Sequence, residues 1–289
     1  MPAWTHLIRF IAVEDSAIHL GQLADPNRDV GLDTVNHVEI KAYLIQGTVF
    51  DGRVTEHILT VKQLLSPISK DDCNYIRCLG LNYSDHAEAG LSLPKAPILF
   101  AKPRAALADP YPAPINMQIP KCAQDGSSDY EAELCFVMGK TGRDIPEEEA
   151  LDYVLGYTAS NDVTARALQL SSPQSSFSKG FDGSCPLGPV LVSSDIIKDP
   201  QTLSLKAIYD GVVVQNGHTE NMIFGVRQQI SYLSQGTTLE AGTIFITRTP
   251  AGIGYFRSPR VVFKDGGDMR VEISGGIETL VNKVRYDTV

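Results

Sequence analysis

The sequence contains no run of about 18 apolar residues, so we expect no membrane-spanning helix. Its opening stretch, MPAWTHLIRFIAVED, lacks the charged segment and apolar core of a secretory signal and instead predicts a first strand. The 5 cysteines are an odd number and include no C-x-x-C pair, which argues against a disulfide framework or a thiolate zinc site. These absences predict a cytoplasmic protein in a reducing compartment.

Positive charge is also scarce. The chain has 25 Lys and Arg against 34 Asp and Glu, a formal net charge of -9, which argues against a nucleic-acid partner. With 289 residues, 43% of them hydrophobic, the chain can bury one large core or a small and a large one. We expect an enzyme that acts on a small molecule.

Short β-type runs separated by Gly and Pro predict a mostly β fold with α/β elements, as a rolled or sandwiched sheet. Residues 1–70 are predicted to form a small N-terminal α/β domain, and residues 71–289 the larger domain. Within the first, HLIRFIAV and VEIKAYLI predict strands, and HILTVKQLL (57–65) predicts a short helix.

Two further helices are predicted in the larger domain. IPEEEALDYVLG (145–156) opens with Pro and acidic residues, as the first turn of a helix prefers. NMIFGVRQQISYLSQG (221–236) has apolar residues at helical spacing and ends in Gly.

Acidic residues occupy alternate positions in SSDYEAELCFVMGK (127–140). Asp129, Glu131 and Glu133 alternate with apolar residues, which predicts a strand that carries the acids on one face. Unpaired carboxylates beside a core repel one another and lose hydration. A metal ion or a Lys/Arg pair must therefore lie between them.

Asp162 is the next acid of interest, because it follows a β-type run and precedes a predicted helix in GYTASNDVTARALQ. With Glu131 and Glu133 it offers three oxygen ligands, a set that suits Mg2+ or Mn2+, whereas zinc more often takes His or Cys. From spacing alone, a metal site and a salt-bridged strand face with Asp162 as a helix N-cap are equally favoured.

Several motifs carry a resemblance to a known family, in that family's order: GLNYSDHAEAG, PILFAKP, DYEAELCFVMGKTGRDI, GYTASNDVTARALQ, SKGFDGSCPLGP, NMIFGVRQQISYLSQGTTLEAGTIFITRTPAGIG and VEISGGIETLVNKV. Together they resemble the fumarylacetoacetate hydrolase family over about residues 75–285, especially its branch of single-chain domain proteins, acylpyruvases and oxaloacetate decarboxylases. The resemblance implies that family's mixed β-roll or sandwich, preceded by a small N-terminal domain, and a homodimer.

The resemblance assigns Glu131, Glu133 and Asp162 as ligands of Mg2+ or Mn2+. It assigns Lys179, in SKGFD, as an active-site lysine beside the metal. His86 is the implied general base, since its unperturbed pKa lies near neutrality. The family pairs this histidine with a glutamate three residues later, but here Glu88 lies two residues later, so the water-activating pair departs from the pattern.

Substrate-binding residues are also implied. Arg166 and Gln169 share one helical face near Asp162, although Arg166 could simply neutralise the acids. Thr249 and Gly252 match a loop that faces the substrate. Arg248 lies between two threonines, where relatives commonly have glycine; either it enters the pocket and binds a second carboxylate or narrows the space, or it forms a structural ion pair.

The implied reaction is Mg2+-dependent cleavage of a C–C bond in a 3-acyl-2-oxo (1,3-diketo) acid through a stabilised enolate, with a small keto acid as the partner. The alternatives are an oxaloacetate-type decarboxylase, a keto–enol tautomerase or isomerase, and a catalytically silent binding protein that keeps the fold.

Overall fold

The computed structural model describes residues 3–84, 93–113 and 117–288. Its strands are β1 His6–Ala12, β2 Ile18–Leu23, β3 Lys41–Gln46, β4 Arg53–Leu65, β5 Tyr75–Gly80, β6 Ile98–Lys102, β7 Leu107–Ala108, β8 Gln118–Ile119, β9 Ser128–Asp129, β10 Ala132–Met138, β11 Val154–Asn161, β12 Thr164–Ala165, β13 Cys185–Ser193, β14 Ser204–Tyr209, β15 Val212–His218, β16 Thr243–Ile246, β17 Asp268–Ile273, β18 Glu278–Lys283 and β19 Arg285–Tyr286. The α-helices are α1 Val30–Val35, α3 Arg166–Leu170, α4 Ser175–Lys179 and α5 Val226–Leu233. Short 3-10 turns cover Arg104–Ala106, Lys121–Ala123, Glu147–Tyr153, Pro200–Thr202 and Thr219–Asn221.

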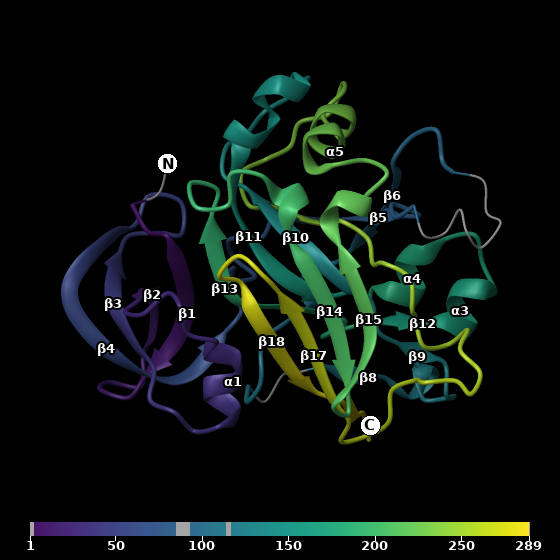
Figure 1. Ribbon diagram of the computed structural model, residues 1–289, viewed down its shortest axis with the longest axis horizontal. Helices are drawn as coiled ribbons and strands as arrows, with labels where there is room; N and C mark the ends of the chain where they lie inside the picture. The colour runs from purple at the N-terminus through teal and green to yellow at the C-terminus, as the bar shows by residue number, and fades with distance from the viewer. Residues whose placement is uncertain (1–2, 85–92, 114–116, 289) are drawn as a thin grey trace.

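The N-terminal unit consists of β1 to β4 and α1, at the left of Figure 1. β1 pairs with both β2 and β4, and β3 joins β2 to β4, so the four strands close on themselves. β1 also pairs with β13, which links this unit to the main sheet. The boundary at residue 70 stays a prediction.

The helix predicted over 57–65 is wrong. These residues form the second half of β4, which pairs with β1 on one side and β3 on the other. Ile58, Thr60 and Val61 are β-branched, and this stiffness favours the extended backbone once two partner strands are available.

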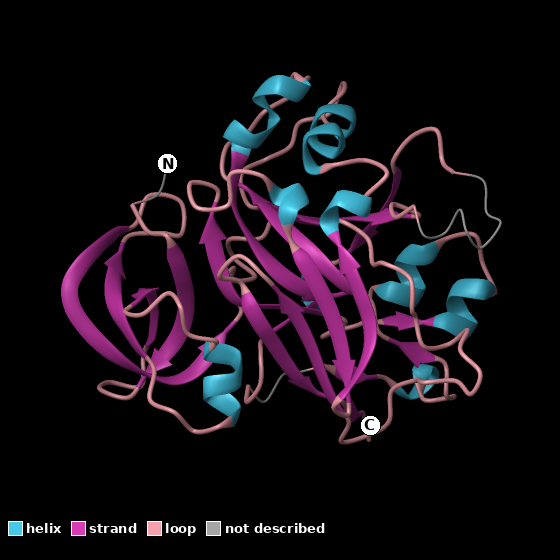
Figure 2. Cartoon of the chain, viewed as in Figure 1, coloured by secondary structure: helices cyan, strands magenta, loops and turns pink. Residues whose placement is uncertain are grey.

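The larger unit stacks two sheets, so the predicted mostly β fold is confirmed (Figure 2). The main sheet runs in the order β2-β3-β4-β1-β13-β11-β10-β16-β5-β6, and a second sheet has the order β15-β14-β17-β18. β10 and β11 are buried along their whole length, because the second sheet covers one face of these strands and a separate cluster that includes Trp4 and Leu7 packs against the other. Phe136 and Phe245 stack at 4.6 Å between neighbouring strands of this core.

Both helices predicted in the larger domain are shorter than expected. Over 145–156 only a 3-10 turn forms, and β11 begins at Val154 because Val154 pairs with Met138. Over 221–236 the helix α5 starts after Gly225, which serves as its N-cap, and ends at Leu233.

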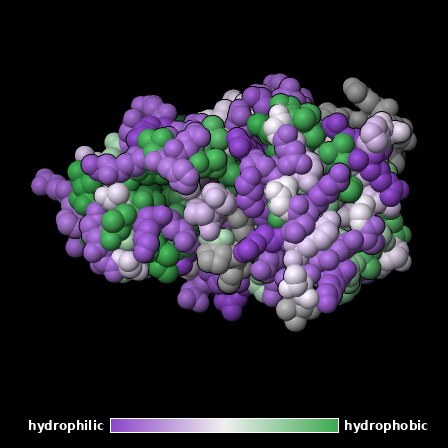
Figure 3. Space-filling model, turned by 90° about the horizontal axis from the view of Figure 1, so that it is seen from below, coloured by the Kyte–Doolittle hydropathy of each residue, from purple (hydrophilic) through white to green (hydrophobic). Residues whose placement is uncertain are grey.

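One face of the molecule, seen from below in Figure 3, is mainly polar with separate apolar patches. Among the described residues, no helix combines the length and the hydropathy that crossing a bilayer requires.

Candidate active site

The three predicted metal ligands meet at the ends of two paired strands. β10 and β11 place Glu133 opposite Ser160, and Asp162 directly follows β11. The Asp162 N–H donates to the Glu131 carbonyl at 2.9 Å. One carboxylate oxygen from each acid lies within 4.8 Å of the others. All three side chains are fully buried.

The segment 127–140 is not one continuous strand. β9 ends at Asp129 and β10 begins at Ala132, so Glu131 lies in the break between them. The backbone there is held by the side chain of Asn161, which accepts the Glu131 N–H at 2.9 Å. The alternation still brings Glu131 and Glu133 together, as the sequence predicted.

Lys179, the last residue of α4, reaches into this cluster. Its Nζ donates to Glu131 Oε2 at 3.0 Å, Asp162 Oδ2 at 2.5 Å and Thr164 Oγ1 at 2.7 Å. Its side chain is only 1% exposed. The predicted active-site lysine therefore bridges two of the three acids.

Arg166 opens α3 and binds two acids at once. Its Nε donates to Asp129 Oδ2 at 2.9 Å, and its Nη1 lies 2.6 Å from Glu131 Oε1 and donates to Gln169 Oε1 at 2.9 Å. These contacts agree with the interpretation that Arg166 neutralises the acid cluster, and substrate binding by Arg166 and Gln169 stays a prediction.

Lys102, at the end of β6, was missed by sequence reasoning. Its fully buried Nζ lies 2.8 Å from Asp162 Oδ1 and donates to the carbonyls of Val163, Lys179 and Ser184. One ammonium group thereby connects a predicted metal ligand to the segment that carries Lys179. The available signal was a lysine inside the apolar run ILFAK.

Asp129 was noticed in the alternating pattern but given no role. It is fully buried and accepts the N–H groups of Gly254 at 2.8 Å and Tyr255 at 3.0 Å, besides the Arg166 bond. It therefore fixes the loop after β16 relative to Arg166. The signal was its place as the third acid on the same face.

The two glutamates have opposite electrostatic environments. Burial alone would raise the pKa of Glu131, but the charges of Lys179, Arg166 and Arg248 outweigh it and hold that pKa well below its usual range. Burial and the neighbouring charges of Asp162 and Glu131 raise the pKa of Glu133 well above its usual range. In the metal-free protein, Glu133 therefore favours its neutral form.

The donor set fits a divalent cation. Glu131 and Asp162 are paired with lysine or arginine, so the Lys/Arg solution that the sequence allowed is present. It is incomplete, because Glu133 Oε1 is buried without a hydrogen-bond partner among the described residues. Three clustered carboxylates are the hard oxygen ligands that Mg2+ and Mn2+ prefer, although the geometry does not identify the ion.

A cavity of about 740 Å³ opens beside this cluster. Its charged and polar lining includes Arg166, Gln169, Lys179, Arg248 and Arg257. The rest of its wall is largely apolar, with Ile98, Leu99, Phe100, Leu170, Pro173, Ile253 and Phe256. The cavity therefore combines cations next to the acids with an apolar surface leading away from them.

The loop after β16 places the remaining predicted residues differently. Arg248 and Gly252 line the cavity, whereas Thr249 is buried, accepts a hydrogen bond from Gln215 Nε2 at 2.7 Å and is not among the lining residues. His86 and Glu88 lie outside the described residues, so their pairing stays a prediction.

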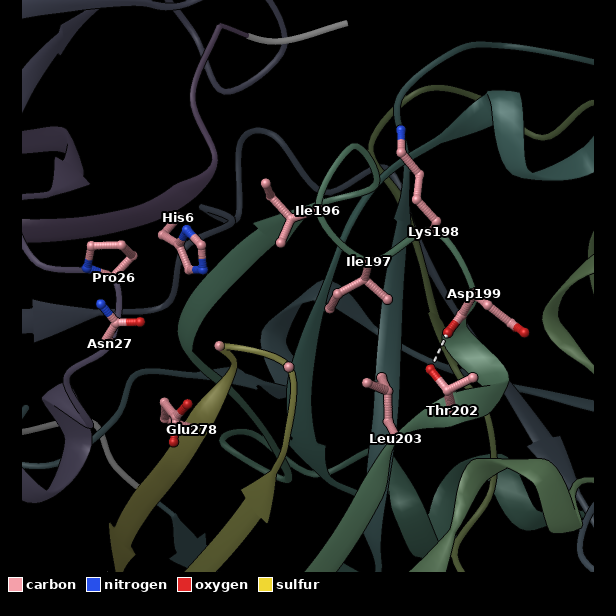
Figure 4. A pocket seen from close by; sticks show the side chains of 12 residues that line it. His6, Pro26, Asn27, Ile196, Ile197, Lys198, Asp199, Thr202, Leu203 and Glu278 are labelled. Atoms are coloured by element: carbon pink, nitrogen blue, oxygen red, sulfur yellow. Dashed lines mark hydrogen bonds between the residues drawn. The ribbon is translucent and has the colours of Figure 1, made fainter.

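A second cavity of about 670 Å³ lies between the N-terminal strands and the second sheet (Figure 4). His6, Asn27, Lys198, Asp199 and Glu278 supply its main polar groups. None of the predicted site residues that the structure describes lines it. The carboxylate cluster therefore marks the first cavity as the candidate active site.

Comparison with known proteins agrees with this fold and this arrangement of residues. The C-terminal domain of fumarylacetoacetate (FAA) hydrolase matches residues 75–285, and the chain belongs to this family. Caffeoylpyruvate hydrolase of Neonothopanus nambi is 43% identical, with 98% of this chain and 94% of that protein covered. The mitochondrial oxaloacetate tautomerase fahd2 of Xenopus laevis is 42% identical over 75% of this chain and 68% of its own length. The crystal structure of 2-hydroxyhepta-2,4-diene-1,7-dioate isomerase from Mycobacterium marinum superposes with a TM-score of 0.80, at 28% identity, over 99% of this chain and 100% of that one.

Proposed function

We propose that this chain is a divalent-metal-dependent hydrolase that cleaves a 3-acyl-2-oxo acid. Water adds to the acyl carbonyl, the bond from that carbon to C3 breaks, and a carboxylic acid and a 2-oxo acid such as pyruvate leave. The observation that supports it most is that the cavity is lined by three cationic residues, Arg166, Lys179 and Arg248, each within 4 Å of the buried Glu131 carboxylate. The similarity to caffeoylpyruvate hydrolase supports the same reaction class.

Glu131, Glu133 and Asp162 would hold Mg2+ or Mn2+. When bound, the ion supplies Lewis-acid polarisation of substrate oxygens. Lys179 would stabilise negative charge on the departing enolate oxygen by its electrostatic field, because the residue lines the cavity and three hydrogen bonds fix its ammonium group. Gln169 lines the cavity too and, held by Arg166, orients the substrate.

The apolar wall suggests the nature of the acyl group. Leu170 and Phe256 are 61% and 64% exposed although both line the cavity. A bulky, flat apolar acyl group, such as an aryl substituent, would cover these side chains and gain the free energy of removing them from water. The small and doubly charged oxaloacetate would leave this wall in water.

His86 is our expected general base for the water, on the resemblance stated above. Glu88 is its expected partner. Both assignments rest on the sequence, because these residues lie outside the described part of the chain.

A tautomerase that moves a proton between the keto and enol forms of oxaloacetate is the second candidate, favoured by the similarity to the Xenopus enzyme. Decarboxylation of oxaloacetate would also form an enolate, which the same groups would stabilise. A catalytically silent binding protein is disfavoured, because the three carboxylates and Lys179 are all present and converge.

One experiment separates these reactions. The Mg2+-loaded protein is incubated with cinnamoylpyruvate, acetylpyruvate or oxaloacetate, the enol absorbance is followed, and pyruvate is assayed with lactate dehydrogenase. Hydrolysis predicts loss of the enol band with one pyruvate for each acylpyruvate, fastest for the aryl substrate. Loss of the oxaloacetate enol band without pyruvate would support the tautomerase, and pyruvate from oxaloacetate alone the decarboxylase.

The assembly is a further expectation. By resemblance we propose a homodimer, which light scattering at several protein concentrations would test.

A further inference from the structure

The pairing of β10 with β16 stops just before the metal-binding end of β10. β16 ends at Ile246, which pairs with Cys135. The same register would place Ala132 opposite Thr249, but the chain leaves the strand before that point, and Arg248 has a φ of 91°. The buried N–H of Ala132 therefore needs an acceptor from another part of the molecule.

Gln215 supplies this acceptor from the second sheet. It belongs to β15, at one end of that sheet's strand order, and is only 2% exposed. Its Oε1 accepts the Ala132 N–H at 3.0 Å. Its Nε2 donates to Thr249 Oγ1 at 2.7 Å and to the Pro250 carbonyl at 2.9 Å. One side-chain amide thus joins the two residues that a longer β16 would have paired.

Both segments joined by this amide belong to the candidate active site. On one side, Ala132 lies between Glu131 and Glu133 in the chain. On the other side, the bonded residues lead directly to Ala251 and Gly252, which line the cavity. Because one planar group holds both segments, its bonds set how far the 248–252 loop lies from the carboxylates.

Close packing also seats the 248–252 loop on β15. A Cβ added at Gly217 would lie 2.7 Å from Pro250 Cβ, so only glycine lets the proline approach the strand this closely. Gly252 has a φ of 109°, and a Cβ added there would lie 2.5 Å from the Val214 carbonyl oxygen and 3.3 Å from Gln215 Cγ. The position of the loop therefore depends on β15 and on the Gln215 side chain.

We propose that Gln215 is a positioning residue that holds the 248–252 loop at a set distance from the predicted metal ligands. Gln215 is not among the residues that line the cavity, so it acts through Ala132 and the loop and not by touching the substrate. The turnover rate depends on this alignment, because a small displacement of groups that orient a substrate slows its reaction strongly. For the identity of the reaction, this inference rests on the proposed function.

Two substitutions at Gln215 and one control test this role. Gln215→Met removes all three hydrogen bonds but keeps an unbranched side chain. Gln215→Glu keeps the shape and the acceptor for the Ala132 N–H, and removes the N–H donors to the loop. Gln201→Met is the matched control, because Gln201 also accepts a backbone N–H, from Val226 at 2.9 Å, and donates to a carbonyl, of Thr219 at 2.7 Å, yet does not line the cavity.

Three quantities are measured for each protein. Steady-state kinetics with cinnamoylpyruvate at saturating Mg2+ give kcat and KM separately. Calorimetry gives the Mg2+ affinity. Amide hydrogen exchange followed by mass spectrometry reports on segments 130–134 and 248–252 without any need for turnover.

We expect Gln215→Met to lower kcat by about 10- to 100-fold, the usual effect of losing a group that orients a metal site, while KM changes little. Both segments should exchange faster in this variant. In Gln215→Glu only the 248–252 segment should exchange faster, because the bond to Ala132 is kept. Gln201→Met should keep the kcat of the wild type and the slow exchange of both segments.

Wild-type kcat in folded Gln215→Met would overturn the proposal, and so would an equal loss of kcat in Gln201→Met or a loss that further Mg2+ restores. If Gln215→Met does not fold, Gln215→Glu decides, and wild-type kcat despite faster exchange of its loop would overturn the proposal. If the wild type cleaves no acylpyruvate, the variants are compared by loss of the oxaloacetate enol band. The proposed reaction then fails, whereas a slower rate in the Gln215 variants alone supports this inference and equal rates in all proteins overturn it.

Discussion

Replacing Glu133 by glutamine should not destabilise the metal-free protein. Burial and the charges of Asp162 and Glu131 raise the pKa of Glu133, so its carboxyl group is held neutral without a metal. A carboxamide has the same shape as that neutral carboxyl, and its oxygen can still accept the Arg248 N–H. We therefore expect the substitution to lower the free energy of unfolding in chelator by at most about 1 kcal/mol, and to raise it at pH values above the ordinary pKa of 4.5, where the unfolded wild type loses this proton and the folded wild type keeps it.

The same substitution should abolish stabilisation by metal. Wild-type protein with Mg2+ at 100 times its Kd gains about 2.7 kcal/mol, which raises Tm by roughly 5 °C for a chain of this size. If loss of the ligand weakens the affinity about 100-fold, the variant gains only about 0.4 kcal/mol at the same Mg2+ concentration. Its Tm should then rise by less than about 1 °C.

Glu131→Gln is the matched control, two residues away in the sequence. Glu131 carries ion pairs with Arg166 at 2.6 Å and Lys179 at 3.0 Å, and all three side chains are buried. Removing the Glu131 anion leaves the buried Arg166 and Lys179 without this partner, a change that typically lowers the free energy of unfolding by about 3–5 kcal/mol. The two variants should thus behave alike toward Mg2+ and very differently in chelator.

The assay is thermal and urea denaturation of wild type and both variants, with and without Mg2+. Equal destabilisation of the two variants in chelator would show that Glu133 is ionised and paired in the metal-free protein. A full Mg2+-induced Tm rise in Glu133→Gln would remove Glu133 from the ligand set.

Three further outcomes are expected. Lys102→Met should destabilise the protein by about 3–5 kcal/mol in urea unfolding, because it removes the ammonium group that pairs with Oδ1 of the buried Asp162. A loss below about 1 kcal/mol would contradict this role. His86→Ala should lower acylpyruvate hydrolysis by roughly 10²–10⁴-fold but spare oxaloacetate decarboxylation, and equal loss of both would count against a general base. In chelator, the raised pKa of Glu133 means that its neutral form favours folding, so its contribution is lost as pH rises above its ordinary value of 4.5. Wild type should therefore lose stability relative to Glu133→Gln as pH rises above about 4.5, and a difference independent of pH would refute that shift.

Much of the site was predictable because its signals are local or depend on motifs. The alternation at Glu131 and Glu133 predicted converging carboxylates, and strand geometry makes that inference reliable even though a break follows Asp129. Asp162 was singled out by its position between a β-type run and a predicted helix, Lys179 came from motif resemblance, and the structure brings both into contact with Glu131.

Other features depend on tertiary contacts that no local pattern contains. Residues 57–65 were predicted as a helix because the apolar spacing of so short a segment suits a helix or a strand. Only the pairing of β4 with β1 and β3 selects the strand. Lys102 resembles an ordinary strand lysine until β6 is placed beside the segments that carry Asp162 and Lys179. Thr249 was predicted to face the substrate, which stays a prediction, but its hydrogen bond with Gln215 of β15 is a long-range contact that the sequence did not indicate.

The acids at the edge of the core are not all stabilised in the same way. Glu131 and Asp162 are each paired with lysine or arginine, and for Glu131 these positive charges hold the pKa well below its usual range. Glu133 lies among them without a cation as near as theirs and with one oxygen lacking a hydrogen-bond partner among the described residues. A dication entering the cluster would favour the charged form of Glu133 and displace its proton, so binding should release protons and weaken as pH falls. The two glutamates therefore have different electrostatic environments although both belong to the same alternating motif, because Arg166 and Lys179 contact Glu131 whereas burial and two neighbouring carboxylates dominate at Glu133.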